Sequence, residues 1–170
     1  IFGGTAGTVT VAVGGVTVGG LGFSTDNYLI DGDPITFGAA GNIAVSTGTS
    51  KIATDIAGTV GLTKIGNGDL RLTFGDYSFS GDIDVQGGDL IFHNGNNDGV
   101  ARSLGGGDFT GNISIAAGST FQFYSNRGGG NPQTFSGVIS GEGGIRLAYN
   151  TTYNLTGANT YTGKTIFHGE

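Results

Sequence analysis

Phe79-Ser80-Gly81-Asp82-Ile83-Asp84-Val85-Gln86-Gly87-Gly88 is the stretch that decides the fold, because its pattern recurs along the chain. An aromatic residue, a hydroxyl residue and glycine, then alternation and a second glycine, return in Phe109-Thr110-Gly111-Asn112-Ile113-Ser114-Ile115-Ala116-Ala117-Gly118. An earlier copy occupies residues 41–48 and a later copy residues 161–169, although Ala39 stands at the aromatic position of the earlier one. Recurrence of one short unit predicts a chain built from stacked repeats.

Alternation inside each copy predicts a short β-strand with one apolar face. We expect the inward face to hold Ile43 and Val45, Ile83 and Val85, Ile113 and Ile115, and Thr165 and Phe167. The outward face then holds Ala44, Asp84, Ser114 and, as an apolar exception, Ile166. Each copy is therefore predicted to be one strand of a sheet whose inner surface is an apolar column.

The spacing between copies favours one architecture. Corresponding glycines recur at steps of 20, 20, 30, 26 and 26 residues: Gly41, Gly61, Gly81, Gly111, Gly137 and Gly163. A hairpin meander would show turn signals about every 8–12 residues. A parallel β-helix instead brings each strand back one coil later, about 4.8 Å from its equivalent. The sequence thus predicts an all-β parallel β-helix of about eight coils, with a β-sandwich as the alternative.

The composition is that of a folded β protein rich in turns. Glycine supplies 37 of the 170 residues and proline only two, which excludes collagen. A flexible linker is excluded because 36% of the residues are hydrophobic. Residues 1–170 are therefore expected to form a single β-helical segment. Its stacked coils are expected to contain an aromatic ladder of Phe79, Phe109, Phe135 and Tyr161.

Charged residues make up only 12% of the chain and leave a net charge of −6. So few cations cannot neutralise many phosphates, which argues against nucleic acid and anionic lipid as partners. The chain has no cysteine, so disulfides are excluded, which suits export. It opens without Met or a basic-then-apolar leader, and no apolar stretch reaches the roughly 20 residues of a membrane-spanning helix. We expect a segment of a longer polypeptide.

Two polar, glycine-rich stretches interrupt the coil period, residues 93–108 and 124–134. Each follows a corresponding strand, so both are expected to protrude as loops from the same side of the stack. Loops that break a repeat often carry partner contacts, and Arg and Tyr dominate binding hot spots. The candidate partner-contact residues are Arg102, Tyr124, Arg127 and Asn131. In the alternative interpretation both loops only tolerate insertion, at little entropic cost.

Several stretches resemble the passenger-associated strand repeats of autotransporters. They are Gly61-Leu62-Thr63-Lys64-Ile65-Gly66-Asn67-Gly68-Asp69-Leu70, Phe135-Ser136-Gly137-Val138-Ile139-Ser140-Gly141 and Leu155-Thr156-Gly157-Ala158-Asn159-Thr160-Tyr161-Thr162-Gly163. Residues 16–28 are similar to the lead-in commonly found in such passengers. The resemblance covers most of the chain and leaves out residues 93–108 and 124–134.

The resemblance implies a right-handed β-helical stalk of a passenger that is secreted through a C-terminal outer-membrane barrel of the parent chain. It also implies display on the bacterial cell surface. Many such parents are adhesins, so the implied partner is a host cell-surface or matrix protein or glycan. The repeats carry no catalytic residues, so no enzyme is expected. A stalk that holds a separate effector domain is a further alternative.

A glycan-active β-helix enzyme is the main catalytic alternative, because such enzymes cluster acids on adjacent coils. The acids in question are Asp69, Asp82, Asp84 and Asp89. Paired carboxylates can act as acid and base when their environments differ. However, Asp82 and Asp89 adjoin glycines at strand ends, where Asp is common in turns. A structural role is the simpler reading of these acids.

No cofactor or metal is expected from the sequence. Glycine–aspartate motifs at residues 66–69, 87–89 and 106–108 are faintly similar to calcium-binding β-roll repeats, but the nine-residue period of those repeats is missing. Calcium held through oxygen ligands stays an alternative for them. His93 and His168 are too few and too far apart for a histidine metal site, and both are expected to face solvent.

Overall fold

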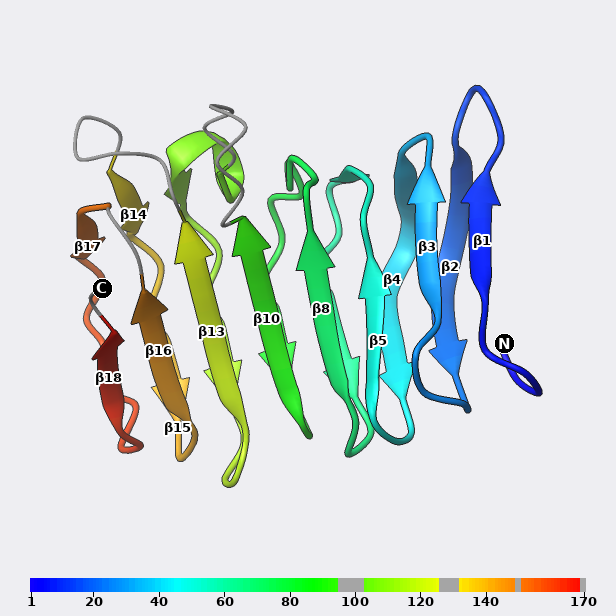
Figure 1. The fold of residues 1–170 in the computed structure, drawn as a ribbon. Helices are drawn as coiled ribbons and strands as arrows, with labels where there is room; N and C mark the ends of the chain where they lie inside the picture. Colours follow the sequence, from blue (N-terminus) through cyan, green and yellow to red (C-terminus); the bar gives the residue numbers. More distant parts are fainter. Residues whose placement is uncertain (95–102, 126–131, 149–150, 169–170) are drawn as a thin grey trace.

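The chain folds as a right-handed parallel β-helix of about seven turns (Figure 1). The computed structural model describes residues 1–94, 103–125, 132–148 and 151–168. In Figure 1 the front strands point up, the rear strands point down, and the chain advances from β1 on the right to β18 on the left, so each turn is right-handed. The predicted all-β parallel β-helix is confirmed, with about seven turns where about eight coils were expected.

One side of the solenoid is an eight-stranded parallel sheet, here called sheet I. Its strands in spatial order are β1 (Thr8–Val11), β3 (Leu29–Gly32), β5 (Thr49–Ile52), β8 (Asp69–Thr73), β10 (Asp89–Asn94), β13 (Thr120–Ser125), β16 (Gly144–Ala148) and β18 (Thr165–His168). From β8 to β16 the strands pair without a bulge, so equivalent side chains stand in straight rows.

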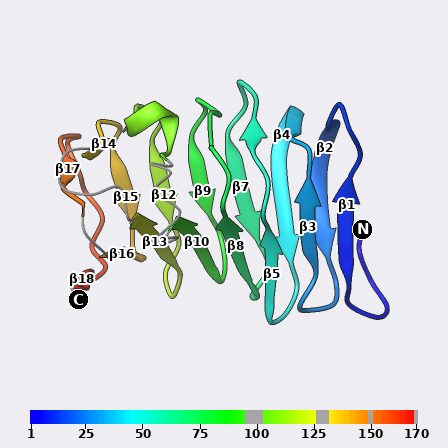
Figure 2. The same cartoon turned by 45° about the horizontal axis from the view of Figure 1, so that its top comes forward.

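The other sides are sheets II and III. Sheet II holds β2 (Val16–Phe23), β4 (Ile35–Val45), β6 (Ile56–Ala57), β7 (Leu62–Ile65), β9 (Ile83–Val85), β12 (Ile113–Ile115) and β15 (Ile139–Gly141). Sheet III holds β11 (Asp108–Phe109), β14 (Gln133–Phe135) and β17 (Tyr153–Leu155). A 3-10 turn, Gly105–Gly107, precedes β11. With the top brought forward in Figure 2, sheet II lies behind sheet I.

The core is a narrow apolar column between the sheets. Sheet I contributes two inward rows, Leu70, Leu90, Phe121 and Ile145, and Leu72, Phe92, Phe123 and Leu147. Sheet II contributes the row Ile83, Ile113 and Ile139. Burying a side chain of this size stabilises the fold by about 1.5–3 kcal/mol relative to exposure. The stacking of coils therefore supplies the hydrophobic core that a single coil lacks.

The inward strand positions of the first three copies are confirmed. The predicted side chains are at most 1% exposed: Ile43, Val45, Ile83, Val85, Ile113 and Ile115. The rings of Phe79 and Phe109 meet edge to face with centroids 5.9 Å apart, and Phe109 pairs in register with Phe135. Three members of the predicted aromatic ladder thus lie on successive coils.

The register of the earliest copy differs from the prediction by two residues. Gly41 pairs with Leu62, and Leu62 pairs with Ile83. Ile43 therefore stands opposite Lys64, in the column of Val85 rather than of Ile83. A shift of two residues keeps every side chain on its original face because strands have a period of two. For this reason the inward face is right although the alignment is wrong.

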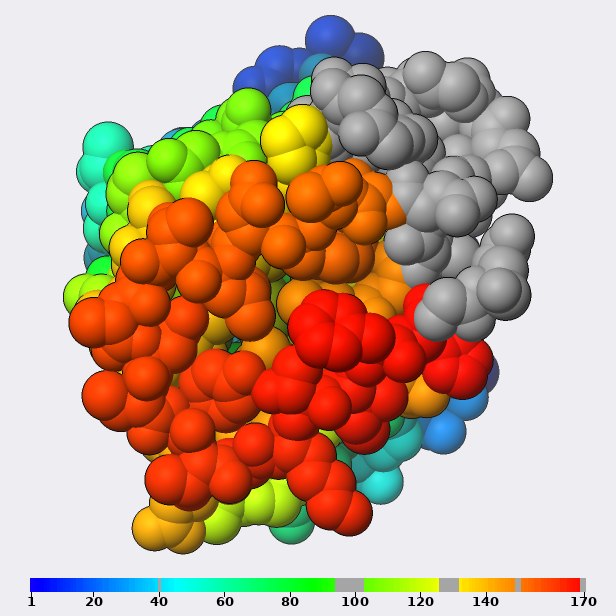
Figure 3. Space-filling view, turned by 90° about the vertical axis from the view of Figure 1, so that its left-hand side faces the viewer, coloured from blue at the N-terminus to red at the C-terminus, as the bar shows by residue number. Residues whose placement is uncertain are grey.

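The last copy lies in a different sheet from the one predicted. Thr165 and Phe167 were expected beside the sheet II positions, but β18 belongs to sheet I and places Phe167 in register with Leu147. Phe135 correspondingly pairs with Leu155, so Tyr161 is not a member of the ladder. Phe167 is 68% exposed, since β18 has a paired neighbour on one side only among the described strands. Figure 3 looks onto this end, where the red C-terminal segment lies at the surface.

The predicted loop boundaries at 93–108 and 124–134 are too wide. His93 lies inside β10 and Tyr124 inside β13. Leu104 is fully buried and bridges to Tyr77, while Asp108 begins β11. The sequence does not reveal these strand ends, because each lies in a polar stretch and holds only one or two inward side chains. Residues 95–102 and 126–131, with the predicted protrusion, lie outside the described residues.

Membrane-spanning helices are absent from the described part of the chain, where no helix is long and apolar enough to cross a bilayer.

Candidate interaction surface

The solvent side of sheet I presents charged, amide and aromatic side chains in rows along the axis of the β-helix. One row passes through β5, β8, β10, β13 and β16 and consists of Lys51, Arg71, Ile91, Gln122 and Arg146. We call this the central row. Members on neighbouring strands are about 4.8 Å apart because that is the spacing of paired strands. The fold therefore sets these side chains in a line.

The two guanidinium groups of the central row lie against the sheet. The Nε atoms of Arg71 and Arg146 are buried and have no hydrogen-bond partner among the described residues. Both side chains are half-buried as a whole, so their aliphatic stems cover the sheet while the charge stays near solvent. Each cation is thus held close to the surface with hydrogen-bonding capacity unused.

A chain of hydrogen bonds crosses the face beside the central row. The Tyr124 hydroxyl donates to Gln122 Oε1 at 2.6 Å. Gln122 Nε2 donates to Asp89 Oδ2 at 2.5 Å. The Tyr124 ring lies 5.6 Å from that of His93. Burial, and secondly the nearby positive charge of Arg71, lower the pKa of His93 below its usual value, so His93 is neutral at pH 7.

Two polar side chains, buried Gln133 and half-buried Tyr153, secure strand ends that flank the inserted segments. Gln133 Nε2 donates to the carbonyl of Leu104 at 3.0 Å, and its Oε1 accepts from the Leu104 N–H at 3.1 Å. The Tyr153 hydroxyl donates to the carbonyl of Ala148 at 2.6 Å and accepts from the Ser125 N–H at 3.3 Å. Each clamp satisfies backbone groups where the strand ladder is interrupted. Neither clamp is visible in the sequence pattern.

Of the four predicted partner-contact residues, the structure describes Tyr124. It is half-buried in β13, in contact with His93 and Gln122. Arg102, Arg127 and Asn131 lie outside the described residues. Of the two histidines expected to face solvent, His168 is exposed, whereas His93 is half-buried beside Tyr124.

The acids considered for catalysis tie successive coils together. Asp69, Asp82 and Asp89 each accept a backbone N–H of the next coil through Oδ1, at 3.0, 2.7 and 3.0 Å. Asp84 accepts from the hydroxyl of Ser114 on the next coil. Asp and Asn at such corners act as backbone acceptors. Among the described residues, no three His, Cys, Asp or Glu side chains are placed to hold a metal ion.

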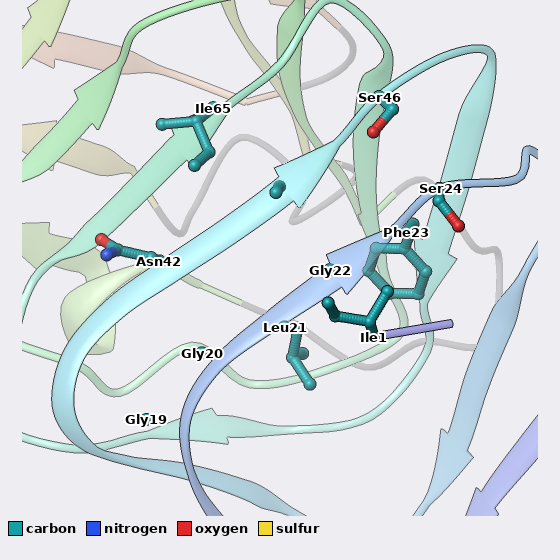
Figure 4. Close-up of a pocket in the computed structure, with 11 residues that line it drawn as sticks. Ile1, Gly19, Gly20, Leu21, Gly22, Phe23, Ser24, Asn42, Ser46 and Ile65 are labelled. Atoms are coloured by element: carbon teal, nitrogen blue, oxygen red, sulfur yellow. The ribbon is translucent and has the colours of Figure 1, made fainter. Parts of the chain in front are cut away.

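A shallow trough of about 520 Å³ lies over the N-terminal strands of sheet II (Figure 4). Its floor is formed by residues with little or no side chain, Gly20, Gly22 and Ala44. Asn42 and Ile65 stand on one side in Figure 4, and Ile1 rests on the other, with Cγ1 3.5 Å from where a Cβ of Gly22 would lie. The trough carries no charged side chain.

Lys64 is a fully buried cation inside the core column. Its Nζ donates to three carbonyls, those of Ile65, Gly66 and Gly87, at 3.2, 2.8 and 2.7 Å. Burial lowers the pKa of Lys64 to about 8, against the opposing charges of Asp69 and Asp89, so the ammonium persists at neutral pH. Lys64 alternates with Leu62 in the sequence, and this alternation is the signal that could have predicted its inward position.

The chain is similar to the adhesin BmaC autotransporter of Brucella suis biovar 1 (strain 1330), with 38% identity over 178 aligned residues. The match covers 97% of this chain, which spans about 5% of the length of that relative. No family model and no solved structure matches the chain. The resemblance to autotransporter passengers drawn from the repeats is confirmed by this relationship together with the β-helical fold.

Proposed function

We propose that this chain, a relative of a segment of an autotransporter adhesin, is a structural and adhesive part of a secreted bacterial passenger. The observation that carries the proposal is the match over 97% of the chain to a protein named as an adhesin. The fold supports it, because an in-register β-helix is a rigid rod that extends by adding coils. The parent chain would carry a C-terminal outer-membrane barrel that exports the rod to the cell surface.

In this proposal the rod supplies the scaffold and its insertions supply the contacts. The clamps made by Gln133 and Tyr153 hold the strand ends that flank both insertions. Tyr124 lies near one of these strand ends, and a contact residue on a fixed strand loses less entropy on binding than one on a loose segment. Arg102, Arg127 and Asn131, with Tyr124, are the proposed contacts with a host cell-surface or matrix protein or glycan.

Loop replacement tests the proposal. Residues 95–102 and 126–131 are each replaced by a short Gly-Ser turn, and Gln133 and Tyr153 are kept so that the clamps remain. We expect an unchanged β-rich circular dichroism spectrum and a cooperative melt, because long surface insertions contribute little to stability. Adhesion of bacteria displaying the passenger to host cells should fall. Full adhesion with both insertions gone would leave the segment as a stalk only.

The proposed role requires no catalysis, cofactor or metal. The inter-coil hydrogen bonds of Asp82 and Asp84 give these acids a structural use. Purified protein incubated with pectins and glycosaminoglycans should release neither reducing ends nor unsaturated products. Activity that disappears in Asp82→Asn or Asp84→Asn would instead establish the glycan-active alternative.

A further inference from the structure

We propose that the central row of sheet I binds an acidic polysaccharide that lies along the axis of the β-helix. This inference rests on the proposed adhesive function and names a ligand class and a site for it. The site consists of Lys51, Arg71 and Arg146, with the buried side chains of Ile91 and Gln122 between the two arginines. All of its members belong to the described strands.

Three of the seven Lys and Arg residues of the chain stand in this row. The protein has seven Lys and Arg residues and a net charge of −6. Lys64 is buried in the core and cannot meet a ligand. Lys51, Arg71 and Arg146 stand in one register row of one sheet. An otherwise acidic protein thus presents a line of cations, and complementary charge is what orients an anionic partner on a surface.

The geometry of the row suits a linear polymer. Lys51 and Arg71 are on adjacent strands, about 4.8 Å apart, and Arg146 follows three strands further, about 14 Å from Arg71. In-register pairing keeps all three on one straight line. A polysaccharide with repeated sulfate or carboxylate groups can meet such a line at successive sugars.

The cations of the row are available to an incoming anion. Lys51 is exposed, and Arg71 and Arg146 are half-buried, so part of each side chain reaches solvent. The acids at the foot of the same face are already engaged: Asp69 Oδ1 accepts the Asp89 N–H, and Asp89 accepts from Thr120 and Gln122. Guanidinium groups bind sulfate and carboxylate oxygens through paired hydrogen bonds. Since their stems lie on the sheet, little side-chain entropy is lost on binding.

The neutral neighbours favour a glycan over other polyanions. Half-buried Tyr124 places a hydroxyl beside the cations, the kind of group that sugar hydroxyls require, whereas Gln122 is buried and its amide is bonded to Tyr124 and Asp89. Nucleic acid affinity depends on neutralising many phosphates, and three cations are too few. A bilayer surface would demand a broader basic area than one row.

The test measures binding of fluorescein-labelled heparin to the 170-residue chain by anisotropy, with neutral dextran as the comparison ligand. We expect heparin binding that weakens with salt, and no dextran binding. Arg71→Gln/Arg146→Gln should weaken heparin binding about tenfold or more, since two charge-assisted contacts are lost. Lys164→Gln is the matched control, because it removes one exposed cation from outside the central row, and it should stay within about twofold of the parent.

Four results would overturn the inference: no heparin binding by the parent chain, no loss in the double variant, an equal loss in Lys164→Gln, or equal binding to phosphatidylserine vesicles. If the glutamine variant misfolds, heparin binding is measured on Arg71→Lys/Arg146→Lys instead. This variant keeps the charge, so a smaller loss of heparin binding is expected. Host-cell adhesion separates the two proposals. Adhesion without heparin binding refutes only the polysaccharide, whereas row-dependent heparin binding without adhesion refutes only the adhesive function.

Discussion

The coils before and after β7 build their cores from different arrangements of strands and different kinds of side chain. In the N-terminal part, the long strands β2 and β4 pair side by side, and each covers the space that later coils divide between two sheets. Apart from the rings of Phe2, Phe23 and Tyr28, the core against these strands is mainly aliphatic, with the buried cation Lys64 at its end. In the C-terminal part, sheet III adds a third side (Figures 1 and 2). Aromatic rings fill much of the core in this part of the molecule.

The C-terminal core is a connected group of aromatic residues. Phe123 contacts the rings of Phe92, Phe135 and Tyr153 at centroid distances of 5.7, 5.5 and 6.2 Å. Edge-to-face pairs add about 0.5–1.5 kcal/mol beyond area burial. The inserted segments occur in this part of the molecule, beside the clamps of Gln133 and Tyr153. Coils interrupted by insertions thus combine an aromatic core with side chains that replace missing backbone partners.

The largest expected effect is that of a buried acid, compared at two positions of sheet II of which one pairs with Lys64. Ile113→Asp places a carboxylate among apolar side chains and should unfold the protein, since an unpaired buried charge costs several kcal/mol. Val85→Asp should cost less, because Val85 pairs with Lys64 in register and the ammonium can neutralise the new acid. Urea denaturation measures both. Equal losses would show that Lys64 gives its part of the core no special tolerance.

The next effect concerns the clamps. Gln133→Leu leaves the N–H and carbonyl of Leu104 without their side-chain partner, and each buried unsatisfied group costs about 1–3 kcal/mol. We expect a clear drop in the urea midpoint with the far-ultraviolet circular dichroism retained. Gln86→Leu, on the exposed surface where Gln86 bonds only Asp84, is the control. A drop no larger than in this control would mean that the clamp is dispensable.

The buried cation should give a rise in stability with pH. The pKa of Lys64 is about 8 in the fold, against 10.5 unfolded. Between these values the unfolded chain binds more protons, so the free energy of unfolding increases as pH rises from about 8 towards 10. Below pH 8 both states are protonated and the slope disappears. Chemical denaturation at pH 7.5, 8.5 and 9.5 should show the rise, and Lys64→Met should abolish it.

Ionisation of Tyr153 should have the opposite effect and lower the free energy of unfolding at higher pH. Burial raises the pKa of Tyr153 to about 12, so its contribution to stability is complete below pH 10 and is lost as the pH rises to 12. Tyr153→Phe should remove this loss. If stability already falls between pH 8 and 9.5 in the parent protein, the assignment of the rise to Lys64 is wrong.

The smallest effect is expected on the outward face of sheet II. Asp84 is half-buried and accepts from Ser114 and Gln86, so Asp84→Ser should lose about 0.5–1.5 kcal/mol, the net value of a typical hydrogen bond. A thermal melt compares it with Ser114→Ala. A loss as large as that of Ile113→Asp would contradict the assignment of inward and outward faces.

The sequence was sufficient for the fold because its signals are local and repeated. Alternation placed Ile83, Val85, Ile113 and Ile115 on the inner face, and period two protects such an assignment against an even shift in register. Glycine spacing then required parallel stacking. The candidate surface was less predictable: Tyr124 was identified as a residue of interest, but as part of a loop, since a strand end inside a polar stretch carries too few inward residues to show alternation.

By itself, the sequence determined that this chain is a parallel β-helix with an apolar column and with insertions after two equivalent strands, because periodic side-chain patterns encode which face is buried. Only the tertiary structure decided which coil stacks on which residue. It brought Lys64 to the carbonyls of Gly66 and Gly87, put Gln133 on Leu104, and lined up Arg71 with Arg146. Except for the contact between Lys64 and Gly66, these contacts join residues one or more coils apart. Insertions of unequal length between coils remove any fixed spacing that would reveal them.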